Sequence, residues 1–147
     1  MVKRLVLLRH AKSSWDDPTL ADRDRPLNRR GRRSAKAVGK WLTGLGIVPD
    51  LILCSDAVRT LETHKRLKIG GELRVLPELY HADADTMMAA MQQAAGTTVM
   101  MIAHNPGVAD FARRIVATPP PHGRFGDFPT AATLIVEIPM VDWEAGH

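Results

Sequence analysis

Histidine and arginine residues follow three separate apolar runs of this sequence, each near the point where the run ends. Arg9 and His10 come directly after the first run. Arg59 follows the second run and His104 follows the third. Arginine binds phosphate oxygens bidentately and keeps its charge at neutral pH. A neutral imidazole beside such cations is a good nucleophile, because nearby positive charge opposes its protonation. These residue types indicate phosphoryl transfer, a reaction for which we expect no metal and no cofactor.

The apolar runs alternate with helical patterns, which favours an α/β fold with a largely parallel sheet. We expect strands at 5–8, 51–54, 98–102 and 133–138, with a short edge strand at 74–76. Helical periodicity predicts helices over 29–45, 57–67, 83–95 and 107–117. The expected architecture is a three-layer αβα sandwich with a mostly parallel central sheet, formed by a single domain over residues 1–147.

The expected sheet determines where the candidate residues meet. In open α/β sheets, ligands bind beyond the carboxyl ends of the strands. If the sheet is parallel at these positions, His10 and His104 converge on one rim with Arg9 and Arg59. A helix that starts near Ala57 would add amide donors at its positive end. A sheet that placed the two histidines on opposite edges would contradict this prediction.

The composition is that of a globular protein, with 147 residues of which 45% are hydrophobic and 24% charged. Cys54 is the single cysteine, so the sequence offers no internal disulfide and no cysteine-based zinc site, which suits a reducing compartment. The apolar run at 5–8 is too short for a signal peptide or a membrane span. We therefore expect a cytoplasmic protein without a membrane partner.

The formal net charge is +4, and eight of the 20 lysines and arginines lie between Arg23 and Lys40. The helix expected over 29–45 carries its cations opposite an apolar face, so the first interpretation of this stripe is a solvent-exposed face. The charge also suits an anionic partner such as a phosphate ester or a phosphoprotein. Nucleic acid is not expected, because only 5% of the residues are aromatic and could stack on bases.

Four short blocks resemble, in the same order, the motifs of the histidine phosphatase superfamily, which has the phosphoglycerate-mutase-like fold: residues 8–12, 25–31, 55–63 and 103–106. The first block is similar to the Arg-His-Gly signature, with Ala11 in place of the usual glycine. The third is similar to the Ser-x-x-x-Arg block and the fourth to the second-histidine block. The short chain and its Arg-His-Ala-Lys sequence resemble the SixA-type phosphohistidine phosphatases.

The resemblance implies a role for each matching residue. His10 would be the phosphoryl acceptor. Arg9, Arg59 and His104 would hold the phosphate and stabilise the charge of the transferring group. The resemblance thus predicts a metal-independent phosphatase that acts through a phosphohistidine intermediate. The expected substrate is phosphohistidine, another phosphoprotein or a small phosphate ester.

The residue that protonates the leaving group is less well marked. Glu78 lies in a segment that resembles the part of related proteins that often supplies a glutamate, and Asp83 is the next candidate. A phosphoramidate has an easily protonated leaving group and could react without a strong acid. Lys12 and Ser13 follow the nucleophile directly and could also reach the phosphate.

Other functions remain as alternatives. A cysteine phosphatase would need a longer loop than the four residues between Cys54 and Arg59, and Cys54 continues an apolar run as a buried small hydrophobe would. A non-catalytic phosphate- or phosphoprotein-binding module would keep the arginines but would not need both histidines. A phosphoglycerate-mutase-type phosphotransferase would need an insertion over the site, and only about twenty residues separate Glu78 from the third expected strand.

Overall fold

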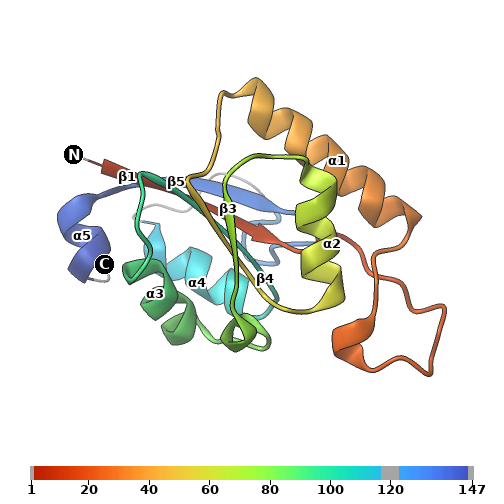
Figure 1. Cartoon of the computed structure of the whole chain (residues 1–147). Helices are drawn as coiled ribbons and strands as arrows, with labels where there is room; N and C mark the ends of the chain where they lie inside the picture. Colours follow the sequence, from red (N-terminus) through yellow and green to blue (C-terminus); the bar gives the residue numbers. More distant parts are fainter. Residues whose placement is uncertain (1, 117–122, 146–147) are drawn as a thin grey trace.

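The computed structural model describes residues 2–116 and 123–145 of the chain. Within these residues, five strands form one mixed sheet in the order β3-β2-β4-β1-β5 (Figure 1). The strands are β1 (Val2–Arg9), β2 (Leu51–Cys54), β3 (Glu72–Val75), β4 (Thr98–Ala103) and β5 (Thr133–Pro139). The first four are parallel to one another, and β5 pairs antiparallel with β1 at one edge. The expectation of a mostly parallel α/β sheet is therefore confirmed.

Helices cover both faces of this sheet, as the expected three layers require (Figure 1). The α-helices are α1 (Arg29–Gly44), α2 (Val58–Leu67), α3 (Ala84–Gln92), α4 (Gly107–Ile115) and α5 (Met140–Ala145). Two 3-10 helices, η1 (Asp22–Asp24) and η2 (Pro77–Leu79), lie in the connections. The helix α5 was not expected from the sequence. Residue 117, the last of the expected fourth helix, lies outside the described residues, and α4 ends at Ile115.

The central strands carry continuous apolar stretches, such as residues 5–8 of β1, because these stretches have a packed helical layer on both sides. Alternate residues of β1 enter different cores, as the two-residue period of a strand requires. Leu5 and Leu7 pack with α3 and α4, whereas Val6 and Leu8 pack with α1 and α2. All four side chains are almost fully buried. The continuous apolar run is therefore the expected pattern for a parallel strand between two helical layers.

Two glycines set the position of α1. A Cβ on Gly31 would lie 2.1 Å from the carbonyl oxygen of Lys12, and one on Gly39 would lie 2.0 Å from that of Leu67. The first contact brings α1 against the loop that follows β1, and the second brings it against the end of α2. The side chain of Asn28 caps the helix and accepts a hydrogen bond of 2.7 Å from the Gly31 amide.

The described part of the chain contains no helix that is both long enough and apolar enough to span a bilayer.

Candidate active site

The ends of three neighbouring parallel strands bring the candidate residues together. Arg9 pairs with Ala103 in the β1–β4 ladder, so the segments that carry His10 and His104 leave the sheet side by side. The ring centroids of these two histidines are 5.1 Å apart. Strand β2 ends one strand further along and leads into α2, which carries Arg59. The structure thus brings both histidines and both arginines to one rim, as expected.

These four residues line a cavity of about 360 Å³ at the carboxyl edge of the sheet. The complete lining is Arg9, His10, Lys12, Ser13, Trp15, Asp22, Arg25, Arg59, His81, His104, Asn105 and Thr130. Lys12 and Ser13, which the sequence suggested as phosphate contacts, are therefore part of the same cavity.

His10 is a buried imidazole with one nitrogen already engaged. Its Nδ1 lies 2.7 Å from the carbonyl oxygen of Ala11, which can only accept a hydrogen bond, so the proton of the neutral ring is on Nδ1. The Nε2 atom then carries the free lone pair. Burial, together with the positive charges of Arg59 and Arg9, lowers the pKa of His10 to about 4, against the opposing effect of the Ala11 hydrogen bond. The ring is neutral at pH 7, as a nucleophile must be.

His104 faces His10 and is also neutral at pH 7. Its Nε2 is 2.8 Å from the hydroxyl oxygen of Ser55, which also accepts a hydrogen bond from the Ala57 amide. The Ser55 hydroxyl can donate its proton to His104 Nε2, and the proton of the neutral ring is then on Nδ1. Burial, followed by the proximity of His10 and Arg59, lowers the pKa of His104 to about 3.

Three buried nitrogens of the cavity-lining residues have no hydrogen-bond partner among the described residues: Arg9 Nε, Arg59 Nε and His104 Nδ1. Unpaired buried donors are costly and uncommon in proteins. The pKa of Arg9 is also lowered, first by burial and then by the charge of Arg59. A cavity lined by mutually repelling guanidinium groups favours an anion rich in oxygen acceptors, such as a phosphoryl group.

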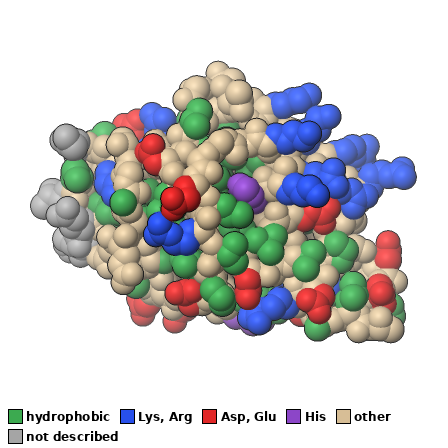
Figure 2. Space-filling model, in the orientation of Figure 1, with side chains coloured by type: hydrophobic (Ala, Val, Ile, Leu, Met, Phe, Trp, Pro, Cys, Tyr) green, Lys and Arg blue, Asp and Glu red, His purple; other side chains and the backbone are tan. Residues whose placement is uncertain are grey.

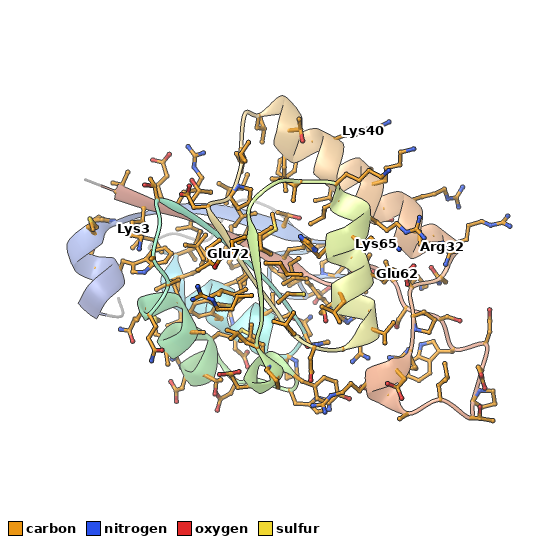
Figure 3. The ribbon with its side chains drawn as sticks, in the orientation of Figure 1. Lys3, Arg32, Lys40, Glu62, Lys65 and Glu72 are labelled. Carbon is orange, nitrogen blue, oxygen red and sulfur yellow. The ribbon has the colours of Figure 1, made fainter. Side chains whose placement is uncertain are left out.

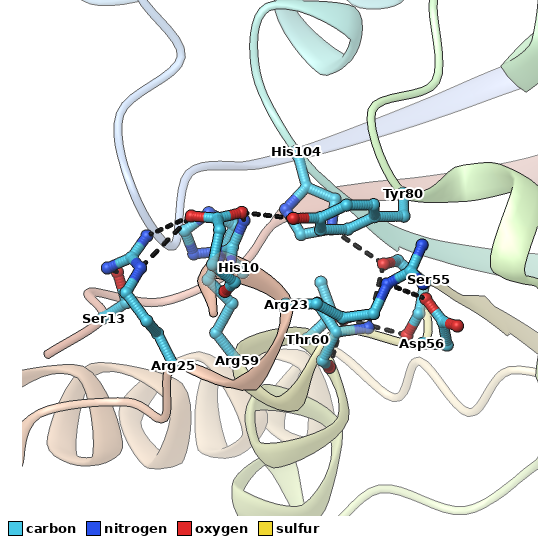
Figure 4. Close-up of polar contacts among 12 residues, drawn as sticks. His10, Ser13, Arg23, Arg25, Ser55, Asp56, Arg59, Thr60, Tyr80 and His104 are labelled. Carbon is cyan, nitrogen blue, oxygen red and sulfur yellow. Dashed lines mark hydrogen bonds and ion pairs between the residues drawn. The ribbon is translucent and has the colours of Figure 1, made fainter. Parts of the chain in front are cut away.

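Asp22 is a site residue that the sequence reasoning missed. Its backbone carbonyl accepts a 2.6 Å hydrogen bond from Arg59 Nη1, and its carboxylate accepts one of 2.9 Å from Arg59 Nη2. Figure 4 labels the three partners of this carboxylate, Arg59, Arg25 and Tyr80. The other carboxylate oxygen lies 3.2 Å from Arg25 Nη2 and also from its Nε. A hydrogen bond from the Tyr80 hydroxyl, followed by those from Arg59, holds the pKa of Asp22 far below its usual range.

The segment η1 places Asp22 because further contacts hold it beside α2. Arg23 forms an ion pair of 3.3 Å with Asp56 and lies over the Tyr80 ring, with 4.2 Å from its guanidinium carbon to the ring centroid. The only signal for Asp22 in the sequence is the alternation of acidic and basic residues over 22–25. That alternation does not reveal which arginine the carboxylate will meet.

Arg25 links the nucleophile loop to η1. Its side chain is 7% exposed, and its Nη1 donates to the Ser13 hydroxyl at 2.8 Å. The guanidinium carbon lies 3.5 Å from the centroid of the Trp15 ring. Arg25 therefore holds Ser13, Trp15 and Asp22 around one side of the cavity.

The loop after His10 tolerates alanine where the family motif has glycine. Ala11 is fully buried against Leu27 and Ala35, and its backbone has no positive φ that would require glycine. Its amide donates a 3.0 Å hydrogen bond to the Thr63 hydroxyl. Thr63 therefore helps to position the residue directly after the nucleophile.

The structure does not bring Glu78 or Asp83 to this cavity. Glu78 is exposed on η2 and lines a separate cavity with Arg74 and Asp85. Asp83 caps α3, where its carboxylate accepts a hydrogen bond of 2.9 Å from the Thr86 amide. The physical reason is the turn at η2, which buries Leu79 and brings Tyr80, not Glu78, towards His104. Neither candidate for the general acid therefore lines the cavity that holds His10 and His104.

Cys54 is fully buried in β2, as expected for a small hydrophobe. Burial raises the pKa of its thiol to about 12, so it is not a thiolate nucleophile at neutral pH.

Asn105, the residue after the second histidine, donates to the carbonyls of Asp127 and Phe128. It thereby holds the segment that leads to Thr130, another residue of the cavity wall.

No group of three or more His, Cys, Asp or Glu side chains that could hold a metal ion occurs in the described ranges.

The sequence profile of the histidine phosphatase superfamily (branch 1) matches residues 5–97. The chain belongs to this superfamily. Within it, the chain resembles the SixA-type branch. A structure assigned as the phosphohistidine phosphatase SixA of Nakamurella multipartitia superposes with a TM-score of 0.83 at 27% identity and covers 98% of this chain and 90% of that one. A second, assigned as SixA of Agrobacterium tumefaciens, has a TM-score of 0.75 at 28% identity, with 90% of each chain covered.

Relatives found by sequence are uncharacterized proteins. A chloroplastic protein of Arabidopsis thaliana is 37% identical over 120 residues, which are 71% of this chain and 55% of the plant protein. A Mycobacterium tuberculosis protein is 35% identical over 107 residues, which cover 71% of this chain and 67% of that protein. This chain therefore spans about half of the length of the plant relative.

Proposed function

We propose that the protein is a phosphatase that transfers a phosphoryl group to Nε2 of His10 and then to water. The observation that carries the proposal is the state of His10. It is a neutral imidazole, anchored through Nδ1, in the same cavity as Arg9, Arg59 and His104. Such a combination is suited to nucleophilic attack on phosphorus with the developing charge held by cations.

In the first step, the lone pair of His10 Nε2 attacks phosphorus, and the bond to the leaving group breaks. The leaving group takes the bonding electron pair and gains a proton from solvent. Arg9 and Arg59 would bind the equatorial oxygens, and His104, which lies beside His10, would help to hold the phosphoryl group. In the second step, water attacks the phosphorus of the phosphohistidine, the bond from phosphorus to Nε2 breaks, and the water releases a proton to solvent. Inorganic phosphate leaves, and the lone pair returns to Nε2.

The state of Asp22 bears on the leaving group. The Tyr80 and Arg59 hydrogen bonds keep this carboxylate ionised at neutral pH, so it has no proton to donate in the free enzyme. Glu78 and Asp83 lie elsewhere. A site without a protonated acid favours a leaving group that accepts a proton easily, such as the imidazole of a phosphohistidine. We therefore propose a phosphohistidine substrate ahead of a simple phosphate ester.

The chain's own cations supply the positive charge, so we also propose that the reaction needs no metal.

The single, buried cysteine further suits a reducing compartment, and we propose a cytoplasmic location that cell fractionation would test.

Brief incubation with a radioactive phosphodonor, such as labelled acetyl phosphate, tests the intermediate. We expect a protein-bound label that is stable in base and labile in acid. His10→Ala should abolish the label and lower turnover by at least ~10³-fold. His64→Ala is the matched control, because His64 lies on α2 and does not line the cavity. Chelation of metals should leave turnover unchanged.

Substantial turnover in His10→Ala would assign the nucleophile elsewhere. If instead the wild-type protein bound phosphate but released none from any phosphohistidine or phosphate ester, the chain would be a phosphate-binding module and not an enzyme.

A further inference from the structure

The solvent side of α1 carries a cluster of exposed cations that the proposed reaction does not use. We call this the α1 surface, formed by Arg29, Arg30, Arg33, Lys36 and Lys40. Figure 2 shows a group of blue side chains where α1 lies in Figure 1, and Figure 3 shows Lys40 extending away from the sheet. None of the five forms an ion pair with another described residue. The helix itself contains no acidic residue.

This arrangement does not stabilise the isolated helix. Arg29 and Arg33 are four positions apart, as are Lys36 and Lys40, and like charges at that spacing repel. Cations in the first turn also oppose the positive end of the helix dipole. Glu62 of the neighbouring α2 does not compensate, because its carboxylate accepts from the Leu27 amide and pairs with Arg66. Local rules of helix stability are most often broken where a surface has a function.

The α1 surface begins at the rim of the His10 cavity. The amide of Asn28, the cap residue of α1, donates to the Lys12 carbonyl at 3.0 Å, and Ser13 forms a β-bridge with Leu27. Lys12 and Ser13 both line the cavity. From Arg29 to Lys40 an α-helix extends roughly 16 Å. A partner whose phosphoryl group entered the cavity could therefore contact this surface as well.

A groove beside the α1 surface could hold a bound segment of a partner. It has a volume of about 380 Å³ and lies between α1 and the end of α2. Gly39 and Leu67, whose close approach joins the two helices, are among its lining residues. Lys36, Lys40 and Lys68 also line it. A groove of this kind suits a segment that carries both apolar and acidic side chains.

We propose that the α1 surface docks an acidic segment of a phosphoprotein, whose phosphorylated side chain enters the His10 cavity. The inference rests on the proposed function, because only a phosphorylated partner must reach both places. Charge complementarity between the five cations and the acidic segment supplies the attraction and speeds encounter. A nucleic acid is the less suitable partner, because Trp41 is the one aromatic residue of α1.

The test compares three phosphohistidine substrates: the free amino acid, a peptide with six flanking glutamates, and the same peptide with glutamines. The variant Arg33→Gln/Lys36→Gln/Lys40→Gln removes three charges from the α1 surface. The control Arg74→Gln/Arg113→Gln/Arg114→Gln removes three charges from β3 and α4. Helix α4 lies on the face of the sheet opposite to the face that α1 covers. Both variants therefore change the net charge equally.

We expect the wild type to prefer the acidic peptide over the neutral one, and this preference should weaken as salt rises. The α1 variant should lose at least ~10-fold in kcat/KM for the acidic peptide. Its turnover of free phosphohistidine should change less than ~2-fold. The control variant should behave as the wild type does with all three substrates.

Equal losses for all three substrates in the α1 variant would overturn the docking proposal, as would a wild type that does not prefer the acidic peptide. A competition assay gives a further outcome that would overturn the proposal. In it, a single-stranded DNA or RNA oligonucleotide would displace the acidic peptide at a lower concentration than the unphosphorylated form of that peptide requires. Failure of the wild type to hydrolyse free phosphohistidine, together with no acid-labile label on His10, would instead reject the proposed function.

Discussion

Replacement of Gly31 by alanine tests how tightly α1 holds the nucleophile loop. Gly31 lies in the first turns of α1, and its α-carbon faces the backbone of Lys12. A Cβ at this position would lie 2.1 Å from the Lys12 carbonyl oxygen and 2.9 Å from the Lys12 nitrogen. Both atoms belong to the backbone, which cannot rotate away as a side chain could. The loop or the helix must therefore move by roughly 1 Å to restore an ordinary contact.

The size of the effect follows from two opposing contributions. Glycine to alanine in a helix normally stabilises by up to about 1 kcal/mol. Overpacking of a tight contact costs about 1–3 kcal/mol. We expect a net destabilisation of about 1–2 kcal/mol, which corresponds to a fall in Tm of roughly 2–8 °C for a domain of this size. Because Lys12 is two positions after His10, a 1 Å displacement of the loop should also lower kcat by roughly 10²-fold.

Gly44→Ala is the matched control, because Gly44 is the last residue of the same helix and a Cβ there meets no atom within 4 Å. Urea unfolding and release of phosphate from phosphohistidine measure stability and kcat for both variants. The control should be as stable as the wild type or slightly more so, with unchanged kcat. If Gly31→Ala behaved like Gly44→Ala in both assays, the reasoning about this close approach would be refuted.

Three further predictions concern charge. Asp22→Asn removes the carboxylate that holds Arg59, so kcat/KM for phosphohistidine should fall roughly 10- to 100-fold; an unchanged value would show that Arg59 is positioned without it. The pKa of His10 is lowered from about 6.5 to about 4, so the unfolded chain binds a proton in this interval that the folded chain does not. Stability should therefore decrease as pH falls from 6.5 towards 4, by on the order of 3 kcal/mol, and urea midpoints at pH 7 and 4.5 should show a smaller decrease in His10→Gln. The thiol of Cys54 is buried and its pKa is raised to about 12, so it should resist a thiol-specific reagent in the native state. Cys54→Ala should keep most of the turnover. Rapid labelling of the native protein would contradict this placement.

The cations of α1 show what a sequence pattern can predict about a surface and what it cannot. Helical periodicity predicts that Arg29, Arg32, Arg33, Lys36 and Lys40 lie on the solvent side. Four of these side chains are exposed, whereas Arg32 is half-buried and donates to the Leu27 carbonyl. It does not show that α1 begins at the rim of the His10 cavity. That relation depends on Gly31, which lets the helix approach Lys12.

The sequence by itself determined the local features of this protein. Apolar runs long enough to be buried on both faces predict the parallel strands, and helical periodicity predicts α1 to α4, because both signals arise from neighbouring residues. The order of the motifs, together with the rule that strand ends meet at one edge, also predicts that His10 and His104 converge.

Only the tertiary structure decided which acid enters the site. Glu78 and Asp22 are both acidic residues in connections between elements, and nothing in their immediate neighbours distinguishes them. The η2 turn leaves Glu78 exposed, whereas the contacts of η1 with α2 and Tyr80 place Asp22 against Arg59. The contacts of Asp22 with Arg59 and Tyr80 join residues 37 and 58 positions apart, and a pairing over such distances depends on the packing of whole elements and not on local sequence.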